Sequence, residues 1–184
     1  IDADSSKIVA LWVDVYDGDG ASSDPDIYCS YSSNDGSSWT NLEEIGSDQY
    51  YEADSFAPAL AYSNDYVYAV YWDGGDNDPE GDTNGNDVMN DDGDIFFRRS
   101  ADDGENWDDV IVISNSDTDG MTYDPPSYSS YYYAYYRSDI AASGSNVYVV
   151  WSNYDYDNAQ YEIRFSKSTN SGNTWSDVSV ISSS

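Results

Sequence analysis

The sequence has no histidine, a single cysteine and few cationic side chains. Six Lys and Arg residues stand against 36 Asp and Glu residues, which gives a formal net charge of −30. A nucleic-acid partner is not expected, because the chain lacks the basic surface that neutralises phosphates. Cys29 alone cannot form an intrachain disulfide. Without histidine, neither a catalytic triad nor a His-rich transition-metal site is expected.

Long hydrophobic runs are also missing. A membrane-spanning helix needs roughly 20 consecutive apolar residues, so no membrane span is predicted. The chain begins with Ile1 rather than Met, which we interpret as an N terminus left by removal of a signal peptide. Salt or bound cations would relieve the repulsion among so many carboxylates. We therefore predict a secreted protein, extracellular or at the cell surface.

Aromatic residues are abundant, with 6 Trp and 20 Tyr among 184 residues, which indicates a folded chain rather than a disordered one. Three of the tryptophans, Trp39, Trp107 and Trp175, are evenly spaced, because 107 − 39 = 68 and 175 − 107 = 68. This period predicts a single module, 1–184, built from three repeats. The repeats cover residues 1–47, 48–115 and 116–184.

Each of these tryptophans ends the same eight-residue pattern, Ser-x-Asp/Asn-x-Gly-x-x-Trp. The Asp or Asn side chain can accept hydrogen bonds from following backbone N–H groups, the Gly can adopt a positive φ, and the Trp can pack the turn onto a sheet. We interpret the pattern as a structural turn. Its positions are Ser32, Asn34, Gly36 and Trp39, then Ser100, Asp102, Gly104 and Trp107, then Ser168, Asn170, Gly172 and Trp175. The pattern resembles the Asp-box, or BNR repeat, which joins the third and fourth strands of blades in sialidase-like β-propellers.

Strand patterns surround each turn. Runs that are apolar on both faces suit sheets stacked between neighbours, as blades are. The fold class expected is all-β, with three antiparallel four-stranded blades of the sialidase-like β-propeller type, of which the first lacks its first strand. First strands are expected at 56–62 and 138–143, second strands at 7–13, 66–72 and 146–151, third strands at 26–32, 94–100 and 162–168, and fourth strands at 42–45, 110–114 and 178–182.

The second repeat contains an acidic insertion, residues 73–94, rich in the oxygen ligands that calcium prefers. Its carboxylates and glycine follow the spacing of a calcium-binding loop in part. Calcium is therefore the cofactor predicted here, and the alternative is a solvated acidic loop of a salt-adapted protein. The candidate ligands are Asp76, Asp78, Glu80, Asp82 and Asp87.

The third repeat contains a tyrosine-rich segment, residues 123–137. Tyrosine rings supply contact area at low entropic cost and end in a polar group, which suits a protein interface and equally suits stacking on sugar rings. The alternative is a long loop folded over its own blade. The candidate interface or ligand-binding residues are Tyr128, Tyr131, Tyr132, Tyr133, Tyr135 and Tyr136.

The resemblance to sialidases implies three arginines that hold a carboxylate, a tyrosine nucleophile with a glutamate, and an acidic acid/base residue. The chain has only four arginines, Arg98, Arg99, Arg137 and Arg164, and lacks the Phe/Tyr-Arg-Ile-Pro motif that carries the first catalytic arginine of that family. We therefore assign no catalytic residue and predict that the protein is not an enzyme. The enzymatic alternative is a sialidase-like glycosidase completed by a second chain.

Three blades cannot close a ring, so their open edges must be covered. The function expected is that of a structural subunit, which self-assembles through these edges and the tyrosine-rich segment into an extracellular filament or surface layer. Its partners would be copies of itself or further blades of a longer chain. The alternative from the binding class is a carbohydrate-recognition module with a glycan partner.

Overall fold

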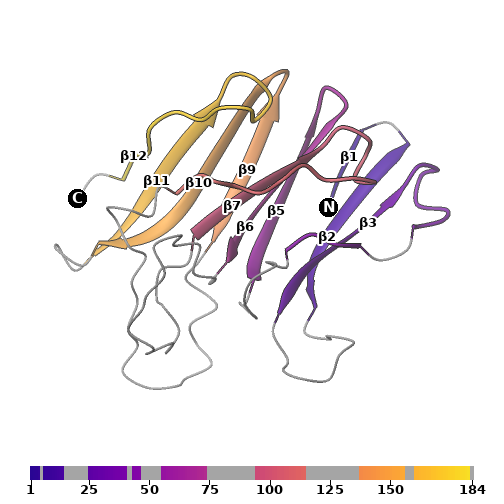
Figure 1. The fold of residues 1–184 in the computed structure, drawn as a ribbon, viewed down its shortest axis with the longest axis horizontal. Coiled ribbons are helices and arrows are strands. Elements are labelled where there is room, and N and C mark those ends of the chain that lie inside the picture. The colour runs from indigo at the N-terminus through magenta and orange to yellow at the C-terminus, as the bar shows by residue number, and fades with distance from the viewer. Residues whose placement is uncertain are drawn as a thin grey trace.

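A computed structural model describes residues 1–4, 6–14, 25–40, 43–46, 55–73, 94–114, 137–155 and 160–182. The described residues form three four-stranded antiparallel sheets and no helix. Figure 1 shows the sheets standing side by side, with the N-terminal and C-terminal sheets on either side of the middle one. We call them blades one, two and three. The all-β, three-blade class predicted from the sequence is confirmed.

Within each blade the strands are hydrogen-bonded in chain order. Blade one comprises β1 (Asp2–Asp4), β2 (Lys7–Asp14), β3 (Asp26–Ser32) and β4 (Glu43–Glu44). Blade two comprises β5 (Ser55–Ser63), β6 (Tyr66–Asp73), β7 (Asp94–Ser100) and β8 (Ile111–Val112). Blade three comprises β9 (Ser138–Ser143), β10 (Asn146–Asp155), β11 (Gln160–Ser168) and β12 (Ser179–Val180).

Blade one has a first strand, contrary to the expectation from the sequence. The three-residue β1 pairs antiparallel with β2, with Asp2 opposite Val9 and Asp4 opposite Lys7. An Asp2 carboxylate oxygen also accepts a hydrogen bond from the main-chain N–H of Tyr62 in blade two, at 2.8 Å. The prediction that this strand is missing was wrong because a three-residue segment whose only apolar residue is an alanine is too short to show the apolar periodicity that reveals other strands.

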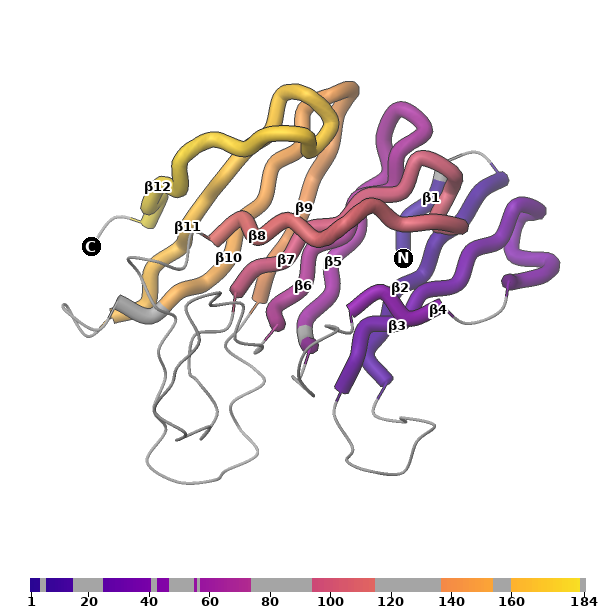
Figure 2. Tube along the Cα trace, viewed as in Figure 1, coloured from indigo at the N-terminus to yellow at the C-terminus, as the bar shows by residue number. Residues whose placement is uncertain are grey.

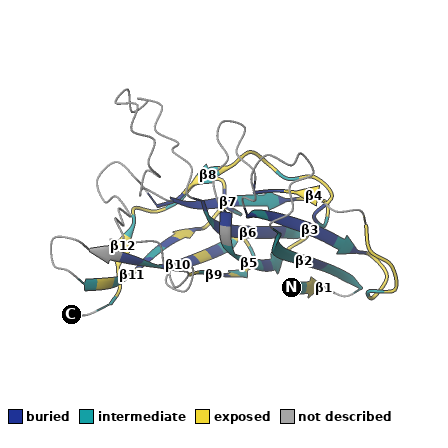
Figure 3. Ribbon diagram, turned by 90° about the horizontal axis from the view of Figure 1, so that it is seen from below, coloured by how far each residue is buried: buried dark blue, intermediate teal, exposed yellow. Residues whose placement is uncertain are grey.

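The core lies between the blades rather than within any one of them. One cluster of buried side chains fills the space between blades two and three, and includes Tyr68, Phe97, Val149 and Trp151. A smaller cluster between blades one and two includes Ile27, Cys29, Tyr71 and Phe96. Figure 3 shows the buried strands concentrated in the middle of the module. Both faces of blade two are thus covered, which explains the continuous apolar runs of β6 and β7.

The turns that join third to fourth strands all lie at one end of the sheets. They span residues 32–39, 100–107 and 168–175, and we call them the repeat turns. Figure 2 traces them as the connections that leave β3, β7 and β11. Because the strands are antiparallel, β2, β6 and β10 end at the opposite edge of the module. The described part of the chain contains no helix long and apolar enough to cross a membrane.

Candidate functional site

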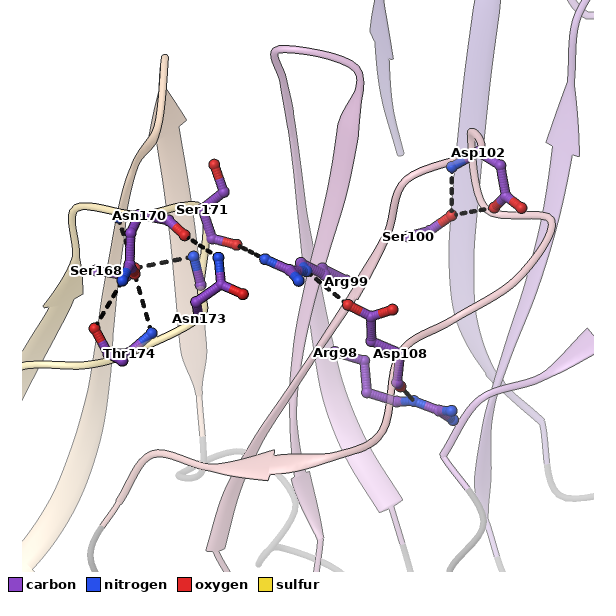
Figure 4. Close-up of polar contacts among 11 residues, drawn as sticks. Arg98, Arg99, Ser100, Asp102, Asp108, Ser168, Asn170, Ser171, Asn173 and Thr174 are labelled. Carbon is purple, nitrogen blue, oxygen red and sulfur yellow. Dashed lines mark hydrogen bonds and ion pairs between the residues drawn. The ribbon is translucent and has the colours of Figure 1, made fainter.

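The three repeat turns have one common geometry, seen for blade three in Figure 4. The Ser168 hydroxyl accepts a hydrogen bond from the N–H of Gly172 at 2.9 Å and lies 2.9 Å from the Asn170 side-chain oxygen. That oxygen accepts the N–H of Thr174 at 3.0 Å. The glycine adopts a positive φ of 82°. The corresponding bonds of the other turns join Ser32, Asn34 and Gly36, and Ser100, Asp102 and Gly104.

Asp102 carries a carboxylate where the other two turns have an amide. Burial would raise its pKa, but hydrogen bonds donated by the side chain and the main-chain N–H of Asn106 outweigh that effect and hold the pKa below its usual value. The carboxylate therefore stays ionised while it organises the turn. Every one of these bonds lies within the turn.

The repeat turns of blades two and three also pack against the preceding blade. The Trp175 ring meets Phe97 of blade two edge-on, with the ring centroids 4.8 Å apart. A Cβ placed on Gly172 would lie 2.4 Å from the Phe97 ring, so any other residue here would require the ring to shift. In the same way Trp107 packs on the cluster between blades one and two, and a Cβ on Gly104 would lie 3.4 Å from Val9. The repeat turn of one blade thus packs against side chains of the blade before it.

A cationic side chain of the preceding blade accompanies each of these contacts. Lys7 of blade one forms an ion pair with Asp103, with its Nζ 2.7 Å from the carboxylate. Arg99 of blade two donates to the main-chain oxygen of Ser171 at 2.6 Å, while its Nε contacts Asp108 at 2.7 Å (Figure 4). Asp103 and Ser171 are equivalent positions, since 171 − 103 = 68, and both immediately precede the turn glycine.

Blade three turns one apolar face away from blade two. Val147, Val149 and Trp151 are buried against blade two, so the alternating residues of β10 lie on the opposite side. There Tyr148 stacks on Phe165, with ring centroids 6.5 Å apart. We call this surface the leading face. It comprises Tyr148, Val150, Ile163, Phe165 and Ile181.

The repeat supplies an internal control for the exposure of this face. Ile27, Ile95 and Ile163 are spaced by 68, yet their exposed fractions are 0%, 2% and 40%. Ile45, Ile113 and Ile181 have the same spacing, and their exposed fractions are 1%, 5% and 55%. Each of the latter donates its N–H to the partner isoleucine at 2.8, 3.0 and 2.8 Å, so the backbone is equivalent in all three blades. Blades one and two bury these positions under the next blade, whereas blade three leaves them open.

Blade one has the complementary opening, at its repeat turn. Trp39 is 44% exposed and belongs to neither buried cluster, whereas Trp107 and Trp175 each pack against one. A Cβ on Gly36 would meet, among the described residues, only Ile8 of its own blade at 3.7 Å. Asp35, which precedes the glycine, is exposed. We call Asp35, Gly36 and Trp39 the open turn.

Two buried carboxylates lie at the other edge of blade two. Asp73 at the end of β6 and Asp94 at the start of β7 are opposite one another, and both are buried. Ser55 lies 2.6 Å from the Asp73 carboxylate, and the Ser114 hydroxyl donates to Asp94. These aspartates are the first and last residues of the insertion for which calcium is predicted. Its candidate ligands Asp76, Asp78, Glu80, Asp82 and Asp87 lie outside the described residues, and within the described ranges no three potential ligands are grouped.

The remaining sequence candidates divide between the described and undescribed parts of the chain. Tyr128, Tyr131, Tyr132, Tyr133, Tyr135 and Tyr136 lie outside the described residues. Arg98 donates to the main-chain oxygen of Ile45 in blade one at 2.8 Å, and Arg99 spans the joint to blade three. Arg164 is buried near Glu162, and Arg137 pairs through its main chain with Ser152. Arg98 and Arg99 thus both bridge neighbouring blades.

Sequence reasoning overlooked the leading face and the open turn as sites. The 68-residue period was the available signal, because it aligns each exposed residue with two buried counterparts. An isoleucine at one of these positions does not reveal by its residue type whether a further blade packs on it. In blades one and two such a blade follows, and in blade three none of the described residues covers the position.

No family model and no curated protein matches the sequence. Solved structures with a similar fold include the Hadza microbial sialidase Hz136, with a TM-score of 0.58, 16% identity, and coverage of 92% of this chain and 34% of that one. A Trypanosoma rangeli sialidase in complex with 2,3-difluorosialic acid gives a TM-score of 0.60 and 14% identity, over 96% of this chain and 29% of that one. The chain spans about a third of the length of these sialidases. The likeness supports a sialidase-like β-propeller fold.

Proposed function

We propose that this chain is a non-catalytic assembly module, whose two open ends bind further blades of its own kind. The supporting observation is the contrast between buried and exposed members of the same repeat position, above all Ile181 against Ile45 and Ile113. A terminal repeat that has no further partner ordinarily carries a polar outer face, which keeps it soluble. Blade three instead presents isoleucine, tyrosine and phenylalanine, as interaction surfaces do.

The presence of β1 completes blade one. With four strands in every blade, blade one has no missing strand for another chain to supply. Assembly would therefore use the broad faces of blades one and three, rather than exchange of strands at their edges. In the extracellular setting that the composition favours, such contacts would build a filament or a surface layer. The repeat turns, which we interpret as Asp-boxes, would form the packing contacts between blades.

Carbohydrate recognition and glycoside hydrolysis are the competing functions. Both would use the edge opposite the repeat turns, where the acidic segment begins at Asp73 and ends at Asp94 and where the tyrosine-rich segment ends at Arg137. Arg98 and Arg99 do not favour hydrolysis, because both are engaged by main-chain oxygens of neighbouring blades. A predicted calcium ion in the acidic segment would act there as a structural ligand or as part of a contact between chains.

Mass photometry and negative-stain imaging of the purified chain, with and without calcium, test the proposal. Ordered particles larger than one chain are expected, and their loss on chelation would place calcium at a contact. A uniform monomer in both conditions would contradict the proposal. Signal from that monomer on a glycan array would instead support carbohydrate recognition, and turnover of a fluorogenic sialoside would support a glycosidase.

A further inference from the structure

We propose that the leading face of blade three binds the open turn of blade one in a second copy of the chain, and that Lys167 pairs there with Asp35 of that copy. This inference rests on the proposed assembly function and specifies its partner and register. The joint would be head-to-tail, so each copy would use both of its open ends. The chain already contains two joints of this kind, between blades one and two and between blades two and three.

The leading face and the open turn have complementary shapes. Within the chain, the glycine of each turn after the first faces a side chain of the preceding blade, Gly104 facing Val9 and Gly172 facing Phe97. Phe165 occupies the position of Phe97 one repeat later, since 165 − 97 = 68. Among the three repeat-turn glycines, Gly36 is the one whose neighbour in the described residues comes from its own blade. Phe165 and Gly36 are therefore the matching halves of a third such contact.

The proposed joint would also bury Trp39 as its two equivalents are buried. Trp107 and Trp175 are packed against third-strand residues of the preceding blade. Placing the open turn on the leading face would give Trp39 the same surroundings, formed by Phe165 and Ile163. It would also cover Ile181, the most exposed of the leading-face isoleucines. One contact would thus bury the apolar side chains of blades one and three that are more exposed than their equivalents in the other blades.

The leading face and the open turn also carry opposite charges. In the internal joints a cation of the preceding blade contacts the residue before the turn glycine, as Lys7 does with Asp103 and Arg99 with Ser171. Lys167 occupies the position of Arg99, since 167 − 99 = 68, and it is exposed. Asp35 occupies the position of Asp103, since 103 − 35 = 68, and it is exposed as well. Cations are scarce in this chain, and one of the six is placed where the open turn offers a carboxylate.

The head-to-tail arrangement follows from these pairings. Two leading faces in contact would place one Lys167 near the other and would provide no glycine seat for Phe165. A contact between different surfaces of identical chains either closes into a ring or continues as a filament. Both products are compatible with the joint, and particle mass distinguishes them.

Two blocking substitutions test the joint, one at each end. Ile163→Asp places a carboxylate on the leading face, and Trp39→Asp places one on the open turn. Each variant keeps one competent end, so each is expected to remain monomeric by sedimentation velocity. An equimolar mixture is expected to form a heterodimer that grows no further, because only one competent joint is present. Both substitutions are at exposed positions, and circular dichroism with thermal unfolding verifies that each variant is folded.

The outcomes separate this inference from the proposed function. A Trp39→Asp chain that dimerises by itself would overturn the head-to-tail joint in favour of a joint between two leading faces, while association as such would stand. Assembly of both single variants at the wild-type level would also overturn the joint. A wild-type chain that stays monomeric at every concentration would overturn the inference together with the proposed function.

A charge exchange tests the register. Lys167→Glu and Asp35→Lys, each alone, are expected to weaken association at least about fivefold, because like charges would then meet. The two substitutions in one chain restore the opposite-charge pair, so association should return toward the wild-type level. Asp65→Lys is the matched control, because Asp65 also has a positive φ and gives the same change in net charge, but it lies on the turn between β5 and β6. A double variant as weak as either single variant would overturn the Lys167–Asp35 pair.

Discussion

Trp175 of blade three stands edge-on to Phe97 of blade two, with ring centroids 4.8 Å apart and ring planes at 72°. This geometry is favourable for aromatic rings and adds about 0.5–1.5 kcal/mol beyond the burial of area. It fixes the repeat turn of one blade to the third strand of the blade before it. The turn recurs in every blade. The contact is therefore formed at the two joints inside the module, while the leading face of blade three and the open turn of blade one lack it.

The glycine at this contact should be far less tolerant of substitution than its equivalent in blade one. Gly172→Ala and Gly36→Ala both force alanine into a positive φ, at a cost of about 1 kcal/mol each. At Gly172 the added Cβ would also lie 2.4 Å from the Phe97 ring, which should add roughly 1–3 kcal/mol. Urea unfolding at low protein concentration measures the difference. Equal losses of stability would show that Phe97 moves aside freely.

A second matched pair compares isoleucines of the same repeat position. Ile95→Ala should reduce the free energy of unfolding by about 2–5 kcal/mol, because the side chain is buried between blades two and three. Ile163→Ala should cost less than about 1 kcal/mol in the monomer, since that side chain is already partly in water. Chemical denaturation of both variants tests the difference, and a large loss at Ile163 would mean that the leading face is covered within the chain.

The sequence predicted the strands well because their signals are local. The second and third strands lie where the patterns indicated, and β9 has the predicted bounds 138–143. The fourth strands are shorter than predicted, as with β8, which covers only Ile111–Val112. The signal for β1 was absent, since its pairing with β2 and its bond to Tyr62 are tertiary contacts.

The site could be predicted only in part, for a physical reason. Ile27, Ile95 and Ile163 share one residue type and one local pattern, and their different exposure depends on whether another blade follows. A sequence window contains no information on that neighbour. The calcium and tyrosine-rich predictions concern residues outside the described ranges and stay predictions.

Arg99 should stabilise the joint between blades two and three through its fixed geometry as well as its charge. Its guanidinium contacts the Ser171 main-chain oxygen and the Asp108 carboxylate, and lies 5.3 Å from the centre of the Tyr66 ring. Arg99→Ala should therefore destabilise the chain by about 1–3 kcal/mol. Arg99→Lys should restore only part of this, because an ammonium cannot reproduce the planar, multiply bonded contact. Thermal unfolding of the two variants provides the comparison, and complete restoration by lysine would show that charge alone suffices.

Alkaline pH should weaken the joint between blades one and two through Cys29. Burial raises the pKa of this thiol to about 11, from 9.0 for an ordinary thiol. The unfolded chain therefore loses the thiol proton at lower pH than the folded chain does. The resulting stabilisation is complete below pH 9 and is lost as the pH rises toward 11. Urea unfolding at pH 7 and pH 10 should show a larger decline for the wild type than for Cys29→Ala, in which tyrosine ionisation still contributes. The Cys29 Sγ is buried and lies 3.7 Å from the Gly104 main-chain oxygen of blade two, so the folded thiol should also resist a thiol-specific reagent at pH 8. Rapid labelling under native conditions would contradict this burial.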